Sequence, residues 1–114
     1  MDIHTIHITQ LQEIITFKGS LNENNENYYQ PYVFKFDFDL SKTTKKKFIE
    51  FCDSLKLDKN ISRVIFSDSS YIEYNKYNNN LILSNSQSRV ILNIISNYKL
   101  FIREIETLRI ELSK

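Results

Sequence analysis

Residues 32–56, YVFKFDFDLSKTTKKKFIEFCDSLK, pass from the pattern of a strand directly into the pattern of a helix. In the first part, aromatic residues occupy every second position from Tyr32 to Phe38, and charged residues follow Phe34, Phe36 and Phe38. Strand side chains alternate between two faces, so this spacing predicts a strand over 32–39 with an aromatic core face.

The second part predicts a helix over about 43–56. Its apolar side chains recur three and four positions apart, which places them on one helical stripe. They are Phe48, Phe51, Cys52 and Leu55. Before the helix stand three candidate N-caps, Ser41, Thr43 and Thr44, whose hydroxyl groups can accept a hydrogen bond from the first turn.

The segment before this region predicts a hairpin. Residues 2–8 alternate between two sets of side chains, and residues 11–18 are rich in β-branched and apolar types up to Gly19. Residues 20–30, SLNENNENYYQ, are polar and rich in asparagine, which predicts a surface loop.

The segment after the helix predicts several short strands and a terminal helix. Strands are expected over 62–67, 71–75 and 81–84, separated by Asp, Ser and Asn turns. RVILNII, residues 89–95, is apolar enough to predict a central strand. A helix is expected over about 98–112. Its apolar stripe is Phe101, Ile105, Leu108 and Leu112.

Together these elements predict an α+β fold in a single domain, residues 1–114. We expect a mainly antiparallel sheet of about five to seven strands, with the two helices covering one face. The terminal helix is expected to pack on the sheet, and a homodimer through its apolar stripe is the alternative.

The composition excludes several classes of enzyme. The 114 residues include one glycine, Gly19, and one proline, Pro31, and no alanine. Glycine-rich phosphate loops and the G-x-S-x-G nucleophile elbow each need more than one glycine. Glycine, alanine and proline all have GC-rich codons, so the composition indicates an AT-rich genome. Asparagine then becomes the natural occupant of left-handed turn positions.

Charge, cysteine content and hydropathy limit the expected partners, metal sites and cellular location of the protein. The formal net charge is +1, so no overall field attracts the protein to nucleic acid or to an acidic membrane. One cysteine excludes an intramolecular disulfide and a multi-cysteine zinc site. The N-terminal sequence lacks the features of a secretory signal, and no apolar run approaches the length of a bilayer span. We expect a cytoplasmic protein without a cofactor.

Few residues suggest catalysis. His4 and His7 are expected on opposite faces of a strand, which disfavours a shared metal ion. Asp37 and Asp39 share a strand face and, with Asp68 or Glu73, are the candidate ligands for a metal-dependent nuclease, the weakest alternative. Cys52 lies on an apolar stripe and is expected to be a buried, inert thiol.

Two sets of residues are candidates for binding. The only basic run is Lys42, Lys45, Lys46 and Lys47, the candidate contact of a small nucleic-acid-binding module. The second set combines carboxylates with tyrosines, which are enriched in protein interfaces. It comprises Asp37, Asp39, Tyr71, Glu73, Tyr74 and Tyr77.

The order of elements over residues 31–112 resembles that of small immunity proteins of bacterial toxin systems. FKFDFDLSKTTKKKFIEFCDSLK leads into YIEYNKYNNNLILSNSQSRVILNII and then a closing helix. Phage anti-defence inhibitors, such as anti-CRISPR proteins, are similar in size and composition. The resemblance implies a non-catalytic inhibitor that covers a partner enzyme, either a toxin or a host-defence enzyme. The expected binding surface of this inhibitor is the set of aspartates, glutamate and tyrosines named above.

Overall fold

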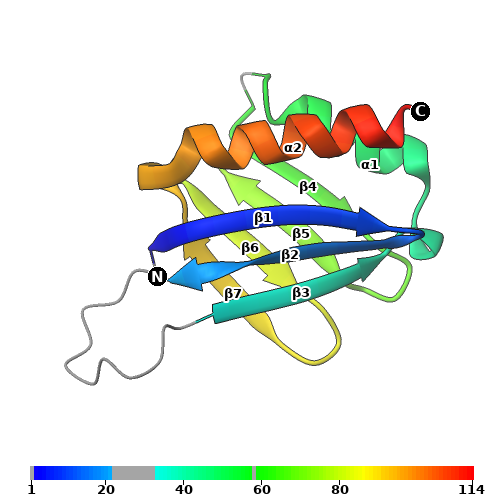
Figure 1. Cartoon of the computed structure of the whole chain (residues 1–114), viewed down its shortest axis with the longest axis horizontal. Coiled ribbons are helices and arrows are strands. Elements are labelled where there is room, and N and C mark those ends of the chain that lie inside the picture. Colours follow the sequence, from blue (N-terminus) through cyan, green and yellow to red (C-terminus); the bar gives the residue numbers. More distant parts are fainter. Residues whose placement is uncertain (1, 22–32, 58) are drawn as a thin grey trace.

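The computed structural model describes residues 2–21, 33–57 and 59–114, which form two antiparallel sheets and two α-helices (Figure 1). A three-stranded sheet contains β1 (Ile3–Leu11), β2 (Ile14–Leu21) and β3 (Val33–Asp39) in that order. A four-stranded sheet contains β4 (Ile61–Ile65), β5 (Tyr71–Asn75), β6 (Asn80–Ser84) and β7 (Arg89–Asn93) in that order. The predicted α+β class is therefore confirmed, and its strands divide into two sheets.

The helices are α1 (Lys45–Ser54) and α2 (Tyr98–Leu112), which lie along the same side of the two sheets (Figure 1). Short 3-10 helices precede them, η1 (Leu40–Lys42) before α1 and η2 (Ile95–Asn97) before α2. Thr44 is the N-cap of α1, because its hydroxyl oxygen accepts a hydrogen bond from the Lys47 amide. Among the described residues, no helix is long and apolar enough to cross a membrane.

The core lies between the buried faces of the sheets and the apolar stripes of both helices, as the periodicity predicts. Phe38 of β3 packs edge-on against Phe17 of β2, with ring centroids 5.8 Å apart. The same ring stacks on Phe66, just after β4, at 5.4 Å, and Phe66 in turn contacts Phe48 of α1 at 6.3 Å. This chain of aromatic rings joins the two sheets and the first helix. Tyr32, which begins the predicted strand, lies outside the described residues.

The N-terminal hairpin is present, but its turn lies at a different place from the one predicted. Leu11 ends β1, and Gln12 turns the chain with a φ of 55°. Gly19 does not end a strand; it lies inside β2, opposite Ile6 and Phe34. A bulge between Ile3 and Thr5 shifts the alternation, which turns Ile3 into the core with Ile6. Most of the expected loop over 20–30 lies outside the described residues.

The apolar segment 89–95 is not a central strand. Its first five residues form β7, the last strand of the four-stranded sheet. Ile91 and Ile95 are 41% and 63% exposed, whereas Leu92 and Ile94 are buried. An apolar run therefore does not require burial of both faces, because only alternate side chains enter this core.

Asparagine side chains stabilise several turns, as the composition suggests. The side-chain oxygens of Asn75, Asn78 and Asn85 each accept a hydrogen bond from a backbone amide two residues later. Asn79 has a left-handed φ of 57°, in the Asn-rich turn before β6. Ser69 and Gln12 occupy the other left-handed positions in the described part of the chain.

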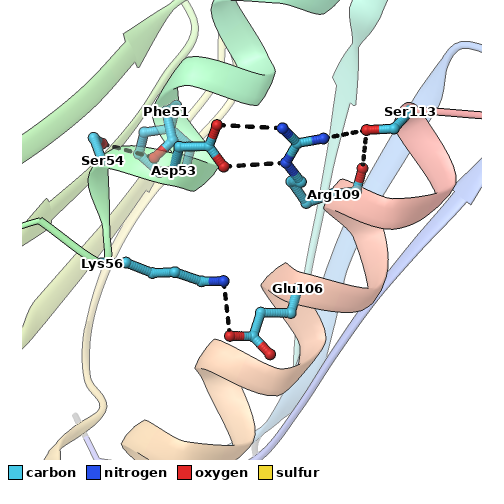
Figure 2. A network of polar contacts seen from close by, with 7 residues as sticks. All are labelled: Phe51, Asp53, Ser54, Lys56, Glu106, Arg109 and Ser113. Carbon is cyan, nitrogen blue, oxygen red and sulfur yellow. Dashed lines mark hydrogen bonds and ion pairs between the residues drawn. The ribbon is translucent and has the colours of Figure 1, made fainter.

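Ion pairs fix α1 against α2 (Figure 2). Both Arg109 nitrogens Nε and Nη2 face the Asp53 carboxylate, at 3.1 and 3.4 Å. Lys56 Nζ lies 2.9 Å from Glu106 Oε1. A bidentate arginine pair defines orientation more tightly than a single contact, so these ion pairs orient α1 relative to α2.

Candidate protein-binding surface

The outer face of the four-stranded sheet presents three rows of side chains. Strand register sets the middle row, which runs from Arg63 of β4 through Glu73 of β5 to Ile82 and Ile91. The row on one side is Ile65, Tyr71, Ser84 and Arg89. The row on the other side is Ile61, Asn75, Asn80 and Asn93.

Isoleucines on this face are open to solvent. Ile61, Ile65 and Ile91 are 50%, 59% and 41% exposed. A β-branched side chain on an uncovered sheet face leaves apolar area in water, which a partner can cover. These isoleucines are not among the binding residues predicted from the sequence. The available signal was ISRVI, residues 61–65, which carries apolar side chains at both parities of a strand.

Arg63 of the edge strand β4 contacts two side chains of β5 on this face. Its guanidinium donates to Glu73 Oε1 from Nε at 2.6 Å and also from Nη2. The same group lies over the Tyr71 ring, 5.9 Å from the centroid. Arg63 remains exposed while Glu73 is buried beneath it, so the face presents a guanidinium and not a carboxylate.

The predicted acidic and tyrosine residues do not gather on one surface. Glu73 and Tyr74 are only 8% and 3% exposed, so the expectation that they form an exposed surface is wrong. Tyr74 points into the core, where its ring packs on Phe101 of α2 at 5.8 Å. It shares the parity of Ile72, and that alternation was the available signal for its burial.

Tyr74 has a polar partner despite its burial. Its hydroxyl group donates to Asn79 Oδ1 at 2.8 Å. Burial is the main cause that raises the pKa of this phenol to about 12, with the nearby Tyr98 as a second cause. Tyr77 is 77% exposed in the turn after β5, away from the rows that contain Tyr71.

Asp37 and Asp39 lie on β3, in the other sheet. Asp37 is exposed and accepts a hydrogen bond from Thr16 Oγ1 at 2.6 Å. Asp39 accepts from the Ser41 hydroxyl and amide at the start of η1, and these bonds lower its carboxyl pKa. Asp68 is held in the same way by Ser70, with a lowered pKa. The two strand aspartates therefore have separate structural roles.

Three of the four candidate metal ligands share a groove, but they do not form a group that could hold a metal ion. Within residues 2–21, 33–57 and 59–114 no group of three His, Cys, Asp or Glu side chains is arranged to hold a metal ion. Asp37, Asp39 and Asp68 line one shallow groove of about 350 Å³, together with Lys35. Glu73, the other proposed ligand, lies on the outer face of the four-stranded sheet and is paired with Arg63.

The two histidines are exposed, and the cysteine is buried in the core. His4 and His7 are exposed, and His7 Nδ1 lies 3.2 Å from Glu104 Oε1 of α2. Cys52 is buried in the core, as expected from its stripe. Burial, followed by the charge of Asp53, raises the pKa of this thiol to about 12, far from the range of a reactive cysteine.

The apolar stripe of α2 is enclosed within the protein. Its members are Phe101, Ile105, Leu108 and Leu112, each at most 3% exposed. The stripe therefore packs on the sheets, as the sequence analysis expects by default. It is not available as a homodimer seam.

The basic run borders a groove. Lys42, Lys45, Lys46 and Lys47 are all exposed. Lys47 lines a groove of about 510 Å³ between α1 and β4, whose other α1 residues are Glu50, Phe51 and Ser54. The strand side of the groove is the whole of β4, Ile61–Ile65.

Comparison with protein-family models, with curated proteins and with solved structures finds no match for this chain in any of the three.

Proposed function

We propose that this protein is a non-catalytic inhibitor that binds a partner enzyme and covers part of its surface. As expected from the sequence, the protein would act in the cytoplasm, and its partner would be a toxin or a host-defence enzyme. The outer face of the four-stranded sheet replaces the acidic and tyrosine surface as the binding region.

One observation carries the proposal: the outer face exposes isoleucines on both edge strands, β4 and β7, and on β4 two of them flank an arginine that lies on a tyrosine. Ile61, Ile65 and Ile91 supply apolar area, while Arg63 and Tyr71 supply polar contacts on β4 and β5. Tyrosine and arginine are enriched among residues that dominate binding energy. The sheet holds the backbone of these residues in a fixed register, so little backbone entropy is lost on binding.

The outer face of the other sheet is more polar and serves as the comparison. One of its middle rows is His7, Lys18 and Lys35. The neighbouring row is Thr9, Thr16 and Asp37. Its exposed apolar residues, Leu11, Ile14 and Val33, lie at the ends of strands. This distribution favours the four-stranded sheet as the contact face.

Affinity purification from the cells that encode the protein tests the proposal. The wild type is compared with Ile65→Lys/Ile91→Lys and with Leu11→Lys/Val33→Lys. Both double variants add two charges at exposed apolar positions, but on different sheets. One enzyme should co-purify in equal amounts with the wild type and the second variant, and its activity should fall when the protein is added.

The first variant should lose this enzyme, because desolvating two lysines in an apolar contact costs several kcal/mol. Matching melting temperatures establish that all three proteins are folded. Equal recovery with both variants would exclude the outer face as the contact. Recovery of no enzyme with the wild type would refute the function itself.

A further inference from the structure

The edge of β4 has unpaired backbone groups directed into the groove beside α1. Phe66 N donates to Ser70 O, and Lys76 N donates to Asn60 O. In an antiparallel ladder, even-numbered residues of β4 therefore bond to β5 and odd-numbered residues point away from it. Within the described part of the chain, no backbone group bonds to the outward N–H and C=O of Ile61, Arg63 and Ile65.

The edge strand β1 of the first sheet differs from β4, because side chains bond to its outward backbone groups. At β1, the Asn97 side chain donates to Ile3 O at 2.6 Å, and Ile8 N donates to Glu104 Oε1 at 3.3 Å. Side chains of η2 and α2 thus occupy backbone groups near both ends of the β1 edge. Beside β4, α1 leaves the groove of about 510 Å³ instead. An uncovered edge is a template for another strand.

The position of α1 makes this groove a defined site. The lining residues Lys47, Glu50, Phe51 and Ser54 are spaced as one helical face. Asp53 of α1 and Lys56, which follows α1, do not line the groove; they form the ion pairs to α2 that Figure 2 shows. The end of the strand edge is closed, because Ser67 N donates to Lys42 O at 2.6 Å.

The charge of the groove indicates the chemistry of its occupant. Lys47 and Lys59 line it and form no ion pair with any described residue, and among the described lining residues Glu50 is the only acid. Lys45 and Lys46 precede it, and the first turn of α1 has no acidic residue. A second copy of this chain would bring two basic edges together, which opposes a β4-to-β4 dimer.

We propose that the groove binds an extended acidic segment of the partner, which adds to β4 as a fifth strand of the four-stranded sheet. The inference rests on the proposed function and names the part of the partner that is recognised. Backbone hydrogen bonds to Ile61, Arg63 and Ile65 hold the segment, and acidic residues alternating with β-branched ones match the basic groove and the exposed isoleucines.

Peptide titration tests this proposal without the partner. The probe is the blocked heptapeptide Glu-Val-Glu-Val-Glu-Val-Glu, and its Lys-Val counterpart is the control. Titration followed by ¹⁵N–¹H NMR should shift the amide signals of Ile61, Arg63 and Ile65 and slow their hydrogen exchange. Methylation of alternate peptide nitrogens should weaken binding about tenfold, because each removes one backbone hydrogen bond, whereas methylation of the intervening nitrogens should not.

Protein variants test the charge requirement. Lys47→Glu/Lys59→Glu should weaken binding of the acidic peptide about tenfold, from two exposed charge contacts. Lys18→Glu/Lys35→Glu makes the same charge change on the other sheet and should have little effect. Ile65→Pro removes one outward N–H without removing a bond to β5, and it should also weaken binding.

The inference would be overturned by no binding of the acidic peptide, by binding insensitive to the position of methylation, or by binding of single-stranded DNA at the groove in its place. A dimer that protects the β4 amides in the free protein would also overturn it. The two proposals fail separately. Loss of peptide binding with the enzyme still recovered refutes only the strand addition, and peptide binding with no enzyme recovered refutes only the inhibitor function.

Discussion

Replacement of Gly19 by alanine should destabilise the protein more than its position in a partly exposed strand suggests. Gly19 lies in β2 between β1 and β3, opposite Ile6 and Phe34. An added Cβ would lie 2.0 Å from the Thr5 carbonyl oxygen and 2.9 Å from two carbons of the Phe34 ring. The ring can rotate, but the carbonyl belongs to the backbone of β1, so the strands themselves must separate.

The expected loss follows from the contacts that this separation disturbs. Relief of the clash needs a shift of about 1 Å, which costs about 1–3 kcal/mol in a packed region. Thr5 Oγ1 accepts from the Ser20 amide at 3.0 Å and shares a hydrogen bond with the Ser20 hydroxyl at 2.8 Å. Weakening each costs about 1 kcal/mol, and the stiffer unfolded chain returns less than 1 kcal/mol. The net expectation is about 3 kcal/mol, or a melting temperature lower by roughly 12 °C.

Urea unfolding at 25 °C, followed by circular dichroism, measures this loss. Lys18→Ala is the matched control, because Lys18 is the exposed neighbour on the same strand and its truncation should change stability by about 0.5 kcal/mol at most. A loss at Gly19→Ala of less than about 1 kcal/mol beyond that control would refute the close approach of β1 and β2.

Thr44→Ala should lower the free energy of unfolding by about 1 kcal/mol, because the Lys47 amide loses its cap; an unchanged urea midpoint would contradict the capping role. Cys52, with its pKa raised to about 12 by burial, should react with a disulfide reagent at pH 8 at least about a hundredfold more slowly in the folded protein than in urea, and equal rates would contradict its burial. Tyr74, with its pKa raised to about 12, should make stability fall between pH 10 and pH 12, because the unfolded phenol ionises first and both states are neutral below that range. Tyr74→Phe should reduce this alkaline decline in melting temperature without abolishing it, because the raised pKa of Cys52 contributes to the decline as well, and a decline of the same size in that variant would exclude Tyr74 as a cause.

Local periodicity predicted most elements because each element buries one face. Phe34, Phe36 and Phe38 all lie in the core, and the stripes of α1 and α2 are buried as expected. A spacing of two or of about 3.6 positions is enough to define such a face. The same reasoning, applied to Ile72 in 71–75, would have placed Tyr74 inside, since the two residues share a parity.

Non-local pairing accounts for what the sequence did not predict. Strand patterns look the same whether a strand lies in the middle or at the end of a sheet, so the apolar segment 89–95 gave no sign that β7 is a terminal strand. The separation of seven strands into two sheets depends on contacts between distant segments, such as Phe38 with Phe66. The need for Gly19 likewise arises from the approach of Thr5, fourteen positions earlier in the chain.

The sequence by itself determined the class of fold, the buried face of most elements and the exclusion of glycine-dependent phosphate sites. Only the tertiary structure decided which polar and apolar residues face water together, because that depends on strand order. It buried Tyr74, covered Glu73 with Arg63 and left Ile61, Ile65 and Ile91 exposed on one face. It also placed side chains of η2 and α2 on the edge of β1 and left the edge of β4 open, because α1 lies beside a groove there.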